Sequence, residues 1–463
     1  MVGKMPFVIE IPEVLEMENN KKESTTAFKW FHATSLNGGA MIIAAAIASY
    51  FSVYMTDTML LPAAACSVIM FIASFWDAIN DPIMGILADK TQTRWGKYRP
   101  YFIFAPILLM IFGTLIWVNP DFSTNGKIAW VLITYIGYGM TVTLYTMPHM
   151  SVLPACVKND NERNKIVVMG AGTMSIAFLI GNTFTGNITA FFEGLGFSNG
   201  YIPFVLCCGV LACISFWGLF ANSEEKYIAP NTGNKGDFKK AIKHVELIPY
   251  IIVWIMASLG YGLMFSSSVY YMIYYFGRPD LIGVYMGVVS VGAAISMIVF
   301  MPLALKIFKS GHKALMWTQL GAAVCYAFLL FFGKSSVAFL FIMTFIATAI
   351  SSMSNGLVNV LVNDAIDYIQ YKEGISANGV ISSIKGFAQK CGNTITNGGL
   401  LAALAAAGYV AGAEQTESAL LAINFMRFGA PIATALIVVI CLQFNPVSKC
   451  KDEILEMKSK MDQ

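Results

Sequence analysis

The chain has 463 residues, of which 57% are hydrophobic and 12% charged, and its mean hydropathy is +0.64. A soluble domain carries roughly 25% charged residues, so this composition excludes a soluble enzyme and a disordered chain. The net charge of +3 gives no sign of nucleic-acid binding. Long apolar runs predict an all-α membrane protein, because backbone polar groups in lipid must bond within their own helix.

Twelve apolar stretches are long enough to cross a hydrocarbon layer, which takes about 20 helical residues. They lie approximately at 36–56, 63–88, 101–118, 128–154, 166–191, 201–221, 249–273, 281–305, 314–333, 337–363, 379–407 and 419–443. The segment 1–35 holds five glutamates and no signal-peptide core, which predicts a cytoplasmic tail. The nine cysteines are scattered through apolar runs, which predicts reduced, packed thiols without a metal site.

The basic residues divide unevenly between the segments that join the predicted spans. With the N-terminus inside, the cytoplasmic segments hold 24 of the 30 Lys and Arg residues, and the outer loops hold three. This asymmetry predicts that both termini are cytoplasmic. The polar linker 222–248 separates a six-helix half at 36–221 from another at 249–443, which a tail at 444–463 follows. Two such halves are the plan of the major facilitator fold, with a substrate site between them.

Two acidic residues lie inside the second predicted span, where charge is costly and indicates function. Asp77, Asn80 and Asp81 are spaced i, i+3 and i+4, so their side chains share one helical face. Measured from Asp89 at 1.5 Å per residue, Asp81 lies about 12 Å deep and Asp77 about 18 Å deep. Two carboxylates at this depth need a proton, a lysine or a bound cation, and oxygen ligands suit Na⁺ or H⁺. A structural network with a lysine is the alternative.

The eleventh predicted span supplies a lysine at matching depth. Lys390 lies about 18 Å from the cytoplasmic end, level with Asp77, and Asn393 follows it on the same face. Two acids and one lysine leave a net charge of −1, which a monovalent cation would neutralise. This balance is the physical basis of a cation-coupling hypothesis. In the alternative, the acids pair permanently with Lys390 and transport is uncoupled.

Other polar side chains are candidates for substrate contact. Asn355 belongs to a polar stripe in the tenth predicted span, and its amide can donate to and accept from sugar hydroxyls. Thr143, Thr146 and His149 line the fourth predicted span. The alternatives are packing between helices for the amide and a satisfied buried residue for the histidine. The sequence holds no nucleophile–base pair, metal-spaced cluster or phosphate-binding loop, so neither an enzyme nor a cofactor is expected.

A long motif in the first half resembles the signature of the glycoside–pentoside–hexuronide:cation symporters, a family that includes melibiose and glucuronide carriers. The motif consists of Trp76–Gly85, Asp89 and Thr93–Pro100. The resemblance continues in both halves, at Tyr145–Pro154, Asp364–Tyr368 and Lys390–Gly392. It implies secondary active transport of a sugar, glycoside or hexuronide-like molecule by alternating access, coupled to Na⁺, Li⁺ or H⁺.

The resemblance also implies roles for the residues that match the family motif. The family's cation site maps onto Asp77, Asn80, Asp81 and Thr143, with Na⁺ at the two acids, and its deep lysine maps onto Lys390. The cytoplasmic gate of the larger superfamily maps onto six charged residues of two loops: Asp89, Arg94, Lys97, Arg99, Asp364 and Asp367. Positive-inside anchoring is the alternative for the basic residues.

The substrate positions depart from the family pattern. Galactoside carriers use acids in the first and fourth spans where this chain has Met41 and Thr146, and Asn37 replaces an acid of other members. The loss of two acids removes repulsion against anionic ligands, which favours an anionic or weakly polar glycoside. The expected substrate-binding residues are Asn37, Thr146, His149, Asn355, Lys390 and Asn393.

The sequence therefore predicts a monomeric symporter in the lipid bilayer of a bacterial cytoplasmic membrane, with a small-molecule substrate and no nucleic-acid partner. An uncoupled facilitator or exchanger of an anionic or amphipathic molecule on the same fold is the alternative.

Overall fold

A computed structural model describes residues 24–227, 243–373 and 378–445. These residues are helical apart from turns and one isolated β-bridge between Thr93 and Gly96. Ten helical segments are long and apolar enough to span a membrane. Helix α5 (Tyr101–Leu115) is a shorter apolar segment. Helix α17 (Asn378–Ala406) is long but carries many polar residues. These twelve segments correspond in order to the twelve predicted spans.

The first half is built from eight α-helices and one π-helical turn among the described residues. They are α2 (Thr26–Ser35), α3 (Gly39–Val53), η1 (Tyr54–Thr58), α4 (Ala63–Lys90), α5 (Tyr101–Leu115), α6 (Thr124–Cys156), α7 (Asp160–Thr183), α8 (Thr185–Gly194) and α9 (Tyr201–Asn222). Hydroxyl and amide side chains cap several helix starts, as expected for Ser, Thr and Asn at that position; the capping residues are Thr25, Ser123 and Asn159.

The second half has nine α-helices and five short 3-10 or π segments in the described part. The α-helices are α11 (Ile248–Tyr270), α12 (Ile282–Ile295), α13 (Met301–Phe308), α14 (Gly311–Phe332), α15 (Val337–Ser351), α16 (Met353–Glu373), α17 (Asn378–Ala406), α18 (Glu417–Asn424) and α19 (Ala430–Gln443). The short segments are η2 (Val245–Leu247), η3 (Tyr271–Tyr275), η4 (Pro279–Leu281), η5 (Ser296–Phe300) and η6 (Phe425–Gly429).

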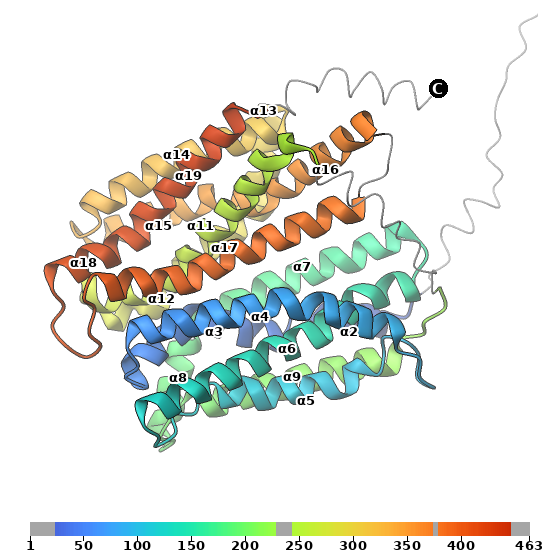
Figure 1. The fold of residues 1–463 in the computed structure, drawn as a ribbon, viewed down its shortest axis with the longest axis horizontal. Helices are drawn as coiled ribbons and strands as arrows, with labels where there is room; N and C mark the ends of the chain where they lie inside the picture. Colours follow the sequence, from blue (N-terminus) through green and yellow to red (C-terminus); the bar gives the residue numbers. More distant parts are fainter. Residues whose placement is uncertain (1–23, 228–242, 374–377, 446–463) are drawn as a thin grey trace, which may run out of the picture.

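The long helices run roughly side by side, with the blue-to-green helices of the first half below the yellow-to-red helices of the second (Figure 1). The start of α2 and the end of α19 lie at the same end of the bundle, which we call the terminal end; the opposite end is the distal end. The main helix pairs that join the halves are α4 with α17, α7 with α12, and α3 with α11, and α8 also contacts α12.

The first span starts earlier than its hydropathy predicts. Residues Thr26–Ser35, part of the predicted tail, form α2, and the chain breaks at Leu36–Gly38 before α3 continues. A side chain at Gly39 would overlap the carbonyl oxygen of Cys208, so the glycine allows α3 to approach α9 closely. Polar residues on α2 hid this helix from a hydropathy criterion.

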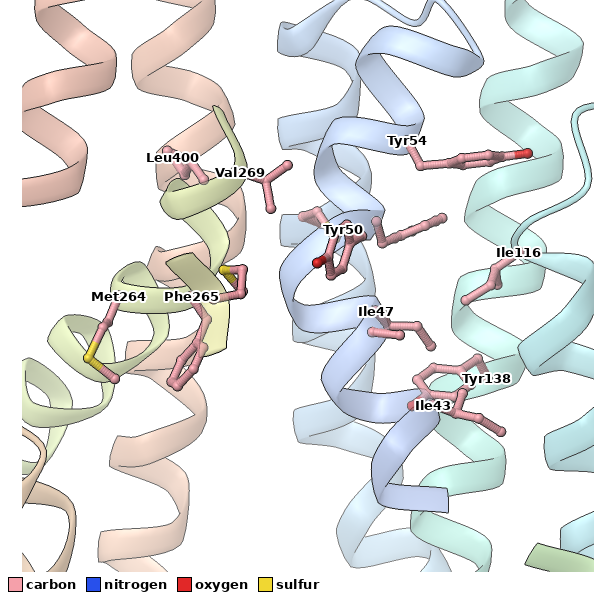
Figure 2. Close-up of a cluster of buried hydrophobic side chains, with 14 of the residues drawn as sticks. Ile43, Ile47, Tyr50, Tyr54, Ile116, Tyr138, Met264, Phe265, Val269 and Leu400 are labelled. Atoms are coloured by element: carbon pink, nitrogen blue, oxygen red, sulfur yellow. The ribbon is translucent and has the colours of Figure 1, made fainter. Parts of the chain in front are cut away.

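One apolar cluster reaches across both halves. Ile47 and Tyr50 of α3 belong to it, together with Phe265 and Val269 of α11 and Leu400 of α17 (Figure 2). Burial of such side chains stabilises the contact between the halves by about 25 cal/mol per Å² of apolar surface where it also removes that surface from water.

Candidate functional site

An ion pair joins the two halves within the membrane-spanning region. The Lys390 ammonium of α17 binds Oδ2 of Asp81 on α4. It also donates to the backbone oxygen of Asp77 at 3.4 Å. The side chains of Lys390 and Asp81 are 37% and 20% exposed, so the pair is neither free in water nor fully enclosed. The rise per residue predicted that Lys390 lies level with Asp77. In the packed structure its ammonium contacts the Asp81 carboxylate instead.

Helix α6 contributes a third polar side chain to this cluster. The Thr143 hydroxyl donates to Asp81 Oδ1 at 3.0 Å and to the Gly139 carbonyl at 3.3 Å. Asp77 Oδ1 lies against Gly139, where a β-carbon would overlap it. The missing side chain at Gly139 thus leaves room for the second carboxylate, and both predicted acids face α6.

Asn80 lies between the two acids on α4 and is almost fully buried, at 3% exposure. Its Nδ2 has no hydrogen-bond partner among the described residues. A buried N–H donor without an acceptor is costly, so Nδ2 is available to donate to a water molecule or to an acceptor on a ligand. Carboxylate, hydroxyl and amide oxygens together form the hard ligand set that suits an alkali cation.

A cavity of about 560 Å³ opens beside the ion pair, between α4 and α6 of the first half and α17 of the second. Its volume falls within the range of small-molecule sites, roughly 300–1,000 Å³. Its described lining consists of Asp81, Val142, Thr143, Thr146, Met147, Met150, Ser383, Gly386, Phe387 and Lys390. From the ion pair the lining residues extend along α6 and α17 toward the terminal end.

The cavity has a polar and an apolar part. Asp81, Thr143 and Lys390 form the polar part. Met150 and Phe387 form much of the apolar part, and their side chains are 65% and 60% exposed. This pattern fits an amphipathic ligand.

Two of the six predicted substrate residues, Thr146 and Lys390, line the cavity. His149 does not: its ring packs against the His32 ring with centroids 4.1 Å apart and planes tilted by 31°, and its Nε2 lies 3.0 Å from the His32 carbonyl oxygen. It belongs to the same helix as Thr146 and Met150, but its position on the helix turns it toward α2. The histidine therefore packs inside the first half.

The other three predicted substrate residues lie outside the described lining of this cavity. The Asn37 amide donates to the Ala33 carbonyl at 3.3 Å, at the break between α2 and α3. Asn355 is half-buried, and its carbonyl accepts from Asn359 at 3.3 Å. Asn393 is exposed on α17.

The predicted gate loop is held by a carboxylate at the start of the linker, just after α9. Glu225 accepts hydrogen bonds of 2.7–2.9 Å from the backbone N–H groups of Lys97, Tyr98 and Arg99. Gly96 adopts a φ of +110°, which directs these three N–H groups to one point. We call this arrangement, made of residues 96–99 and Glu225, the loop clasp.

The basic side chains of the loop contribute further contacts. Arg99 donates from Nε and Nη2 to the Phe220 carbonyl near the end of α9, at 3.1 and 2.8 Å. Arg94 lies over the Trp95 ring, 4.6 Å from its centroid. Asp364 and Asp367 lie on α16, half-buried. The side chain of Asp89 lies outside the described part of the structure.

Several residues of the site escape sequence reasoning. Met147, Met150 and Phe387 read as ordinary lipid-facing or core residues in an apolar span. Only helical spacing could have placed them on the cavity face: Met147 is i+4 from Thr143, Met150 is i+4 from Thr146, and Phe387 lies three residues before Lys390. Glu225 stands in a polar linker, where nothing distinguishes it from its neighbour Glu224.

Comparisons with known proteins agree with this architecture. A family model described as MFS/sugar transport protein matches residues 36–449. The isoprimeverose transporter of Lactiplantibacillus pentosus is 27% identical over 417 residues, covering 88% of this chain and 86% of the relative. The glucuronide carrier protein homolog of Escherichia coli is 24% identical over 423 residues, covering 88% and 90%.

Among solved structures, a bacterial homolog of the human lysosomal transporter Spinster matches with a TM-score of 0.67 at 14% identity, covering 90% of this chain and 95% of that one. At this identity the likeness shows the fold, which is the predicted one: an all-α membrane protein of twelve transmembrane helices in two six-helix halves. The chain is thus a membrane transporter rather than an enzyme, and it belongs to the MFS/sugar transport family, in agreement with the predicted resemblance to glycoside and hexuronide symporters.

Proposed function

We propose that this protein is a symporter that couples the movement of Na⁺ or H⁺ to uptake of a glycoside by alternating access. The observation that carries the proposal is the cluster of Asp77, Asn80, Asp81 and Thr143 beside Lys390, at the polar end of a cavity between the halves. A cation bound by the two carboxylates competes with the ammonium for Asp81. Lys390 is then released toward the cavity, where it can bind substrate.

This competition supplies the coupling. Cation binding raises the affinity for substrate, and by thermodynamic linkage substrate raises the affinity for the cation by the same factor. The buried amide of Asn80 and the hydroxyl of Thr143 add neutral oxygens to the two charged ones. A site of this kind favours a small hard cation over a transition metal.

The cavity favours an amphipathic substrate with an anionic or hydroxyl-rich head. The head would lie at Lys390 and Thr146, and a less polar part at Met150 and Phe387. The names of the isoprimeverose transporter and the glucuronide carrier homolog point to sugar-type substrates, of which the second is anionic. The Lys390 ammonium would attract a carboxylate or sulfonate of the substrate only after its release from Asp81.

We further propose that the terminal end faces the cytoplasm of a bacterial cell and that the protein works as a monomer in the inner membrane. The excess of Lys and Arg in the segments at this end supports the orientation. The cavity extends toward the same end, as in an inward-facing transporter, and the similar Spinster homolog was solved in an inward-facing conformation.

Proteoliposomes test the proposal directly. Uptake of a panel of glycosides and hexuronides is measured with an inward Na⁺ gradient, with a pH gradient, and with neither. We expect accumulation with at least one gradient and its loss in Asp81→Asn, whereas Asp121→Asn in an exposed loop leaves it unchanged. Accumulation that ignores both gradients contradicts cation coupling.

An uncoupled facilitator or exchanger is the second candidate, and the existing bond between Lys390 and Asp81 favours it. In that case the pair is a permanent structural contact. The double variant Asp81→Asn/Lys390→Met separates the two candidates. If the unmodified protein and the double variant both exchange labelled substrate and neither responds to a gradient, the facilitator is supported. If the unmodified protein accumulates substrate with a gradient and the double variant does not, the symporter is supported.

A further inference from the structure

A second polar contact joins the two halves at the distal end, far along the bundle from the ion pair. It centres on Asp57 in the π-helical turn η1, at the end of the first span. Asp57 Oδ2 accepts from the Tyr274 hydroxyl at 2.6 Å, and Oδ1 accepts from the Tyr409 hydroxyl at 2.5 Å. Thr56 donates to the same Oδ1 at 2.6 Å. One carboxylate of the first half therefore binds two tyrosines of the second.

A further hydroxyl contact joins the two halves at the distal end, along the line of contact that we call the seam. The Thr56 hydroxyl lies 3.0 Å from the Tyr270 hydroxyl. The three tyrosine rings pack edge to face, with Tyr409 at 5.6 Å from Tyr270 and 5.3 Å from Tyr274. We call Thr56, Asp57, Tyr270, Tyr274 and Tyr409 the distal clamp.

Local backbone distortions orient the side chains of the distal clamp. Asp57 and Tyr274 both lie in π-helical turns, η1 and η3, which rotate side chains away from the regular helical face. Tyr409 follows Gly408, whose φ is +78°. The amides of Gly408 and Tyr409 bond back to the carbonyls of Ala405 and Leu404, which is a Schellman ending of α17. Three separate local distortions thus converge on one carboxylate.

The clamp borders open space. Tyr409 also lines a cavity of about 480 Å³ at the distal end, between the start of α4 and the end of α17. Beyond the clamp the halves are therefore not tightly packed. The hydroxyl contacts to Asp57 are polar bonds between the halves at this end, and one residue past Cys66 the Ser67 hydroxyl donates to the Gly398 carbonyl of α17 at 2.7 Å.

We propose that Asp57 is a gating residue, whose carboxylate binds the hydroxyls of Tyr274 and Tyr409 to hold the distal end closed and must release both for that end to open. When the halves separate, Asp57 keeps only Thr56 of its own half. Hydrogen bonds to an ionised group are stronger than neutral ones, so their loss favours the closed state until another gain offsets it. The inference does not depend on which substrate or cation is carried.

A thiol already present in the chain can report opening of this seam. Cys66 of α4 is 0% exposed, and it belongs to the buried apolar cluster that also contains Tyr270 of the second half. In a protein that keeps Cys66 as its one cysteine, we measure the rate of labelling by a membrane-impermeant maleimide applied at the distal side of proteoliposomes. Labelling requires the seam to open.

We expect the double variant Tyr274→Phe/Tyr409→Phe to label about tenfold faster or more, since each lost bond involves a charged acceptor. Asp57→Ala should have at least this effect. The matched control is Tyr326→Phe, which removes a buried hydroxyl that lies 2.9 Å from Ser351 within the second half. Its labelling rate should stay unchanged.

Two results overturn the proposal. Labelling at the unchanged rate in the double tyrosine variant means that the hydroxyl contacts do not hold the seam. An equal increase in Tyr326→Phe means that loss of any buried hydroxyl loosens the bundle. The tyrosine variants keep their rings and volume, so they remain informative if Asp57→Ala does not fold. Because labelling needs no substrate, its outcome is separate from that of the uptake experiment.

Discussion

Asp81 is the residue of the first half whose carboxylate forms an ion pair with a lysine of the second half. It accepts from Thr143 at 3.0 Å and binds the Lys390 ammonium, while Asp77 lies one helical turn away against Gly139. Asp77, Asp81 and Lys390 were recognisable in the sequence because charge inside a span is rare, whereas Thr143 was indicated for the cation site only by the family resemblance and Gly139 was not predicted. The pairing of Lys390 with Asp81 was not recognisable, because a rise of 1.5 Å per residue gives depth along a helix but not which carboxylate an ammonium reaches.

Replacing one partner of the Asp81–Lys390 ion pair should destabilise the protein more than the loss of the pair as a whole would suggest, because one charge is left without its counter-charge. We expect Lys390→Met to lower the free energy of unfolding by about 2 kcal/mol, because it leaves Asp81 without its counter-charge; partial exposure reduces the larger cost of a fully buried pair. Asp81→Asn should act similarly. The double variant should lose less than the sum, as measured by chemical unfolding in detergent. Additive losses would mean that the two charges do not interact.

The space at Gly139 should matter for the cation. Gly139→Ala places a β-carbon where Asp77 Oδ1 lies, so the carboxylate must move. We expect the apparent affinity for the coupling cation to fall at least several-fold, as measured by cation-dependent thermal shift, although no ionisable group is lost. Gly172→Ala is the matched control, because a β-carbon there meets nothing. Equal effects in both variants would contradict a specific role for Gly139.

At the scale of elements, the turn after α4 is shaped by a contact with the segment after α9. Glu225 collects three successive backbone N–H groups, and Arg99 binds the end of α9. The predicted gate loop is therefore anchored by the end of α9 and the start of the linker that follows it. The sequence indicated the loop and its basic residues, but a carboxylate 126 residues further along the chain from Arg99 holds it.

Removing that carboxylate should loosen the loop clasp. In Glu225→Ala we expect the amides of Lys97, Tyr98 and Arg99 to exchange hydrogen about tenfold faster, because they lose hydrogen bonds to a charged acceptor. Native-state hydrogen exchange with peptide-level mass spectrometry measures this. The neighbouring Glu224→Ala removes an exposed acid paired with Lys226 and should leave the exchange unchanged. Protection retained in Glu225→Ala would show that the loop is held by other contacts.

At the scale of the whole molecule, the site exists only where the halves meet. Asp81 and Thr143 come from the first half, Lys390 and Phe387 from the second, and the cavity lies between them. The ion pair and the distal clamp are two separate cross-half contacts of different chemistry. A transporter that rocks its halves must remake such contacts in every cycle, since packed interfaces switch rather than deform.

Filling the cavity should block binding without unfolding the protein. Gly386 lines the cavity, and a β-carbon there meets nothing within 4 Å. We expect Gly386→Trp to abolish the thermal shift caused by substrate while the melting temperature of the free protein stays within about 2 °C. Gly194→Trp, at an equally open position on α8, should keep the substrate response. Undiminished binding to Gly386→Trp would place the substrate elsewhere.

The sequence by itself determined the fold class, the twelve spans and the family, because hydrophobic length, charge asymmetry and a long motif are local properties of the chain. It also singled out Asp77, Asp81 and Lys390, since charge within lipid is costly wherever the helices pack. Only the tertiary structure decided that Lys390 reaches Asp81, that His149 turns away toward His32, and that Asp57 meets two tyrosines of the other half. Those contacts depend on helix rotation, on π-helical turns and on the approach of helices distant in sequence, and no periodicity within one segment encodes them.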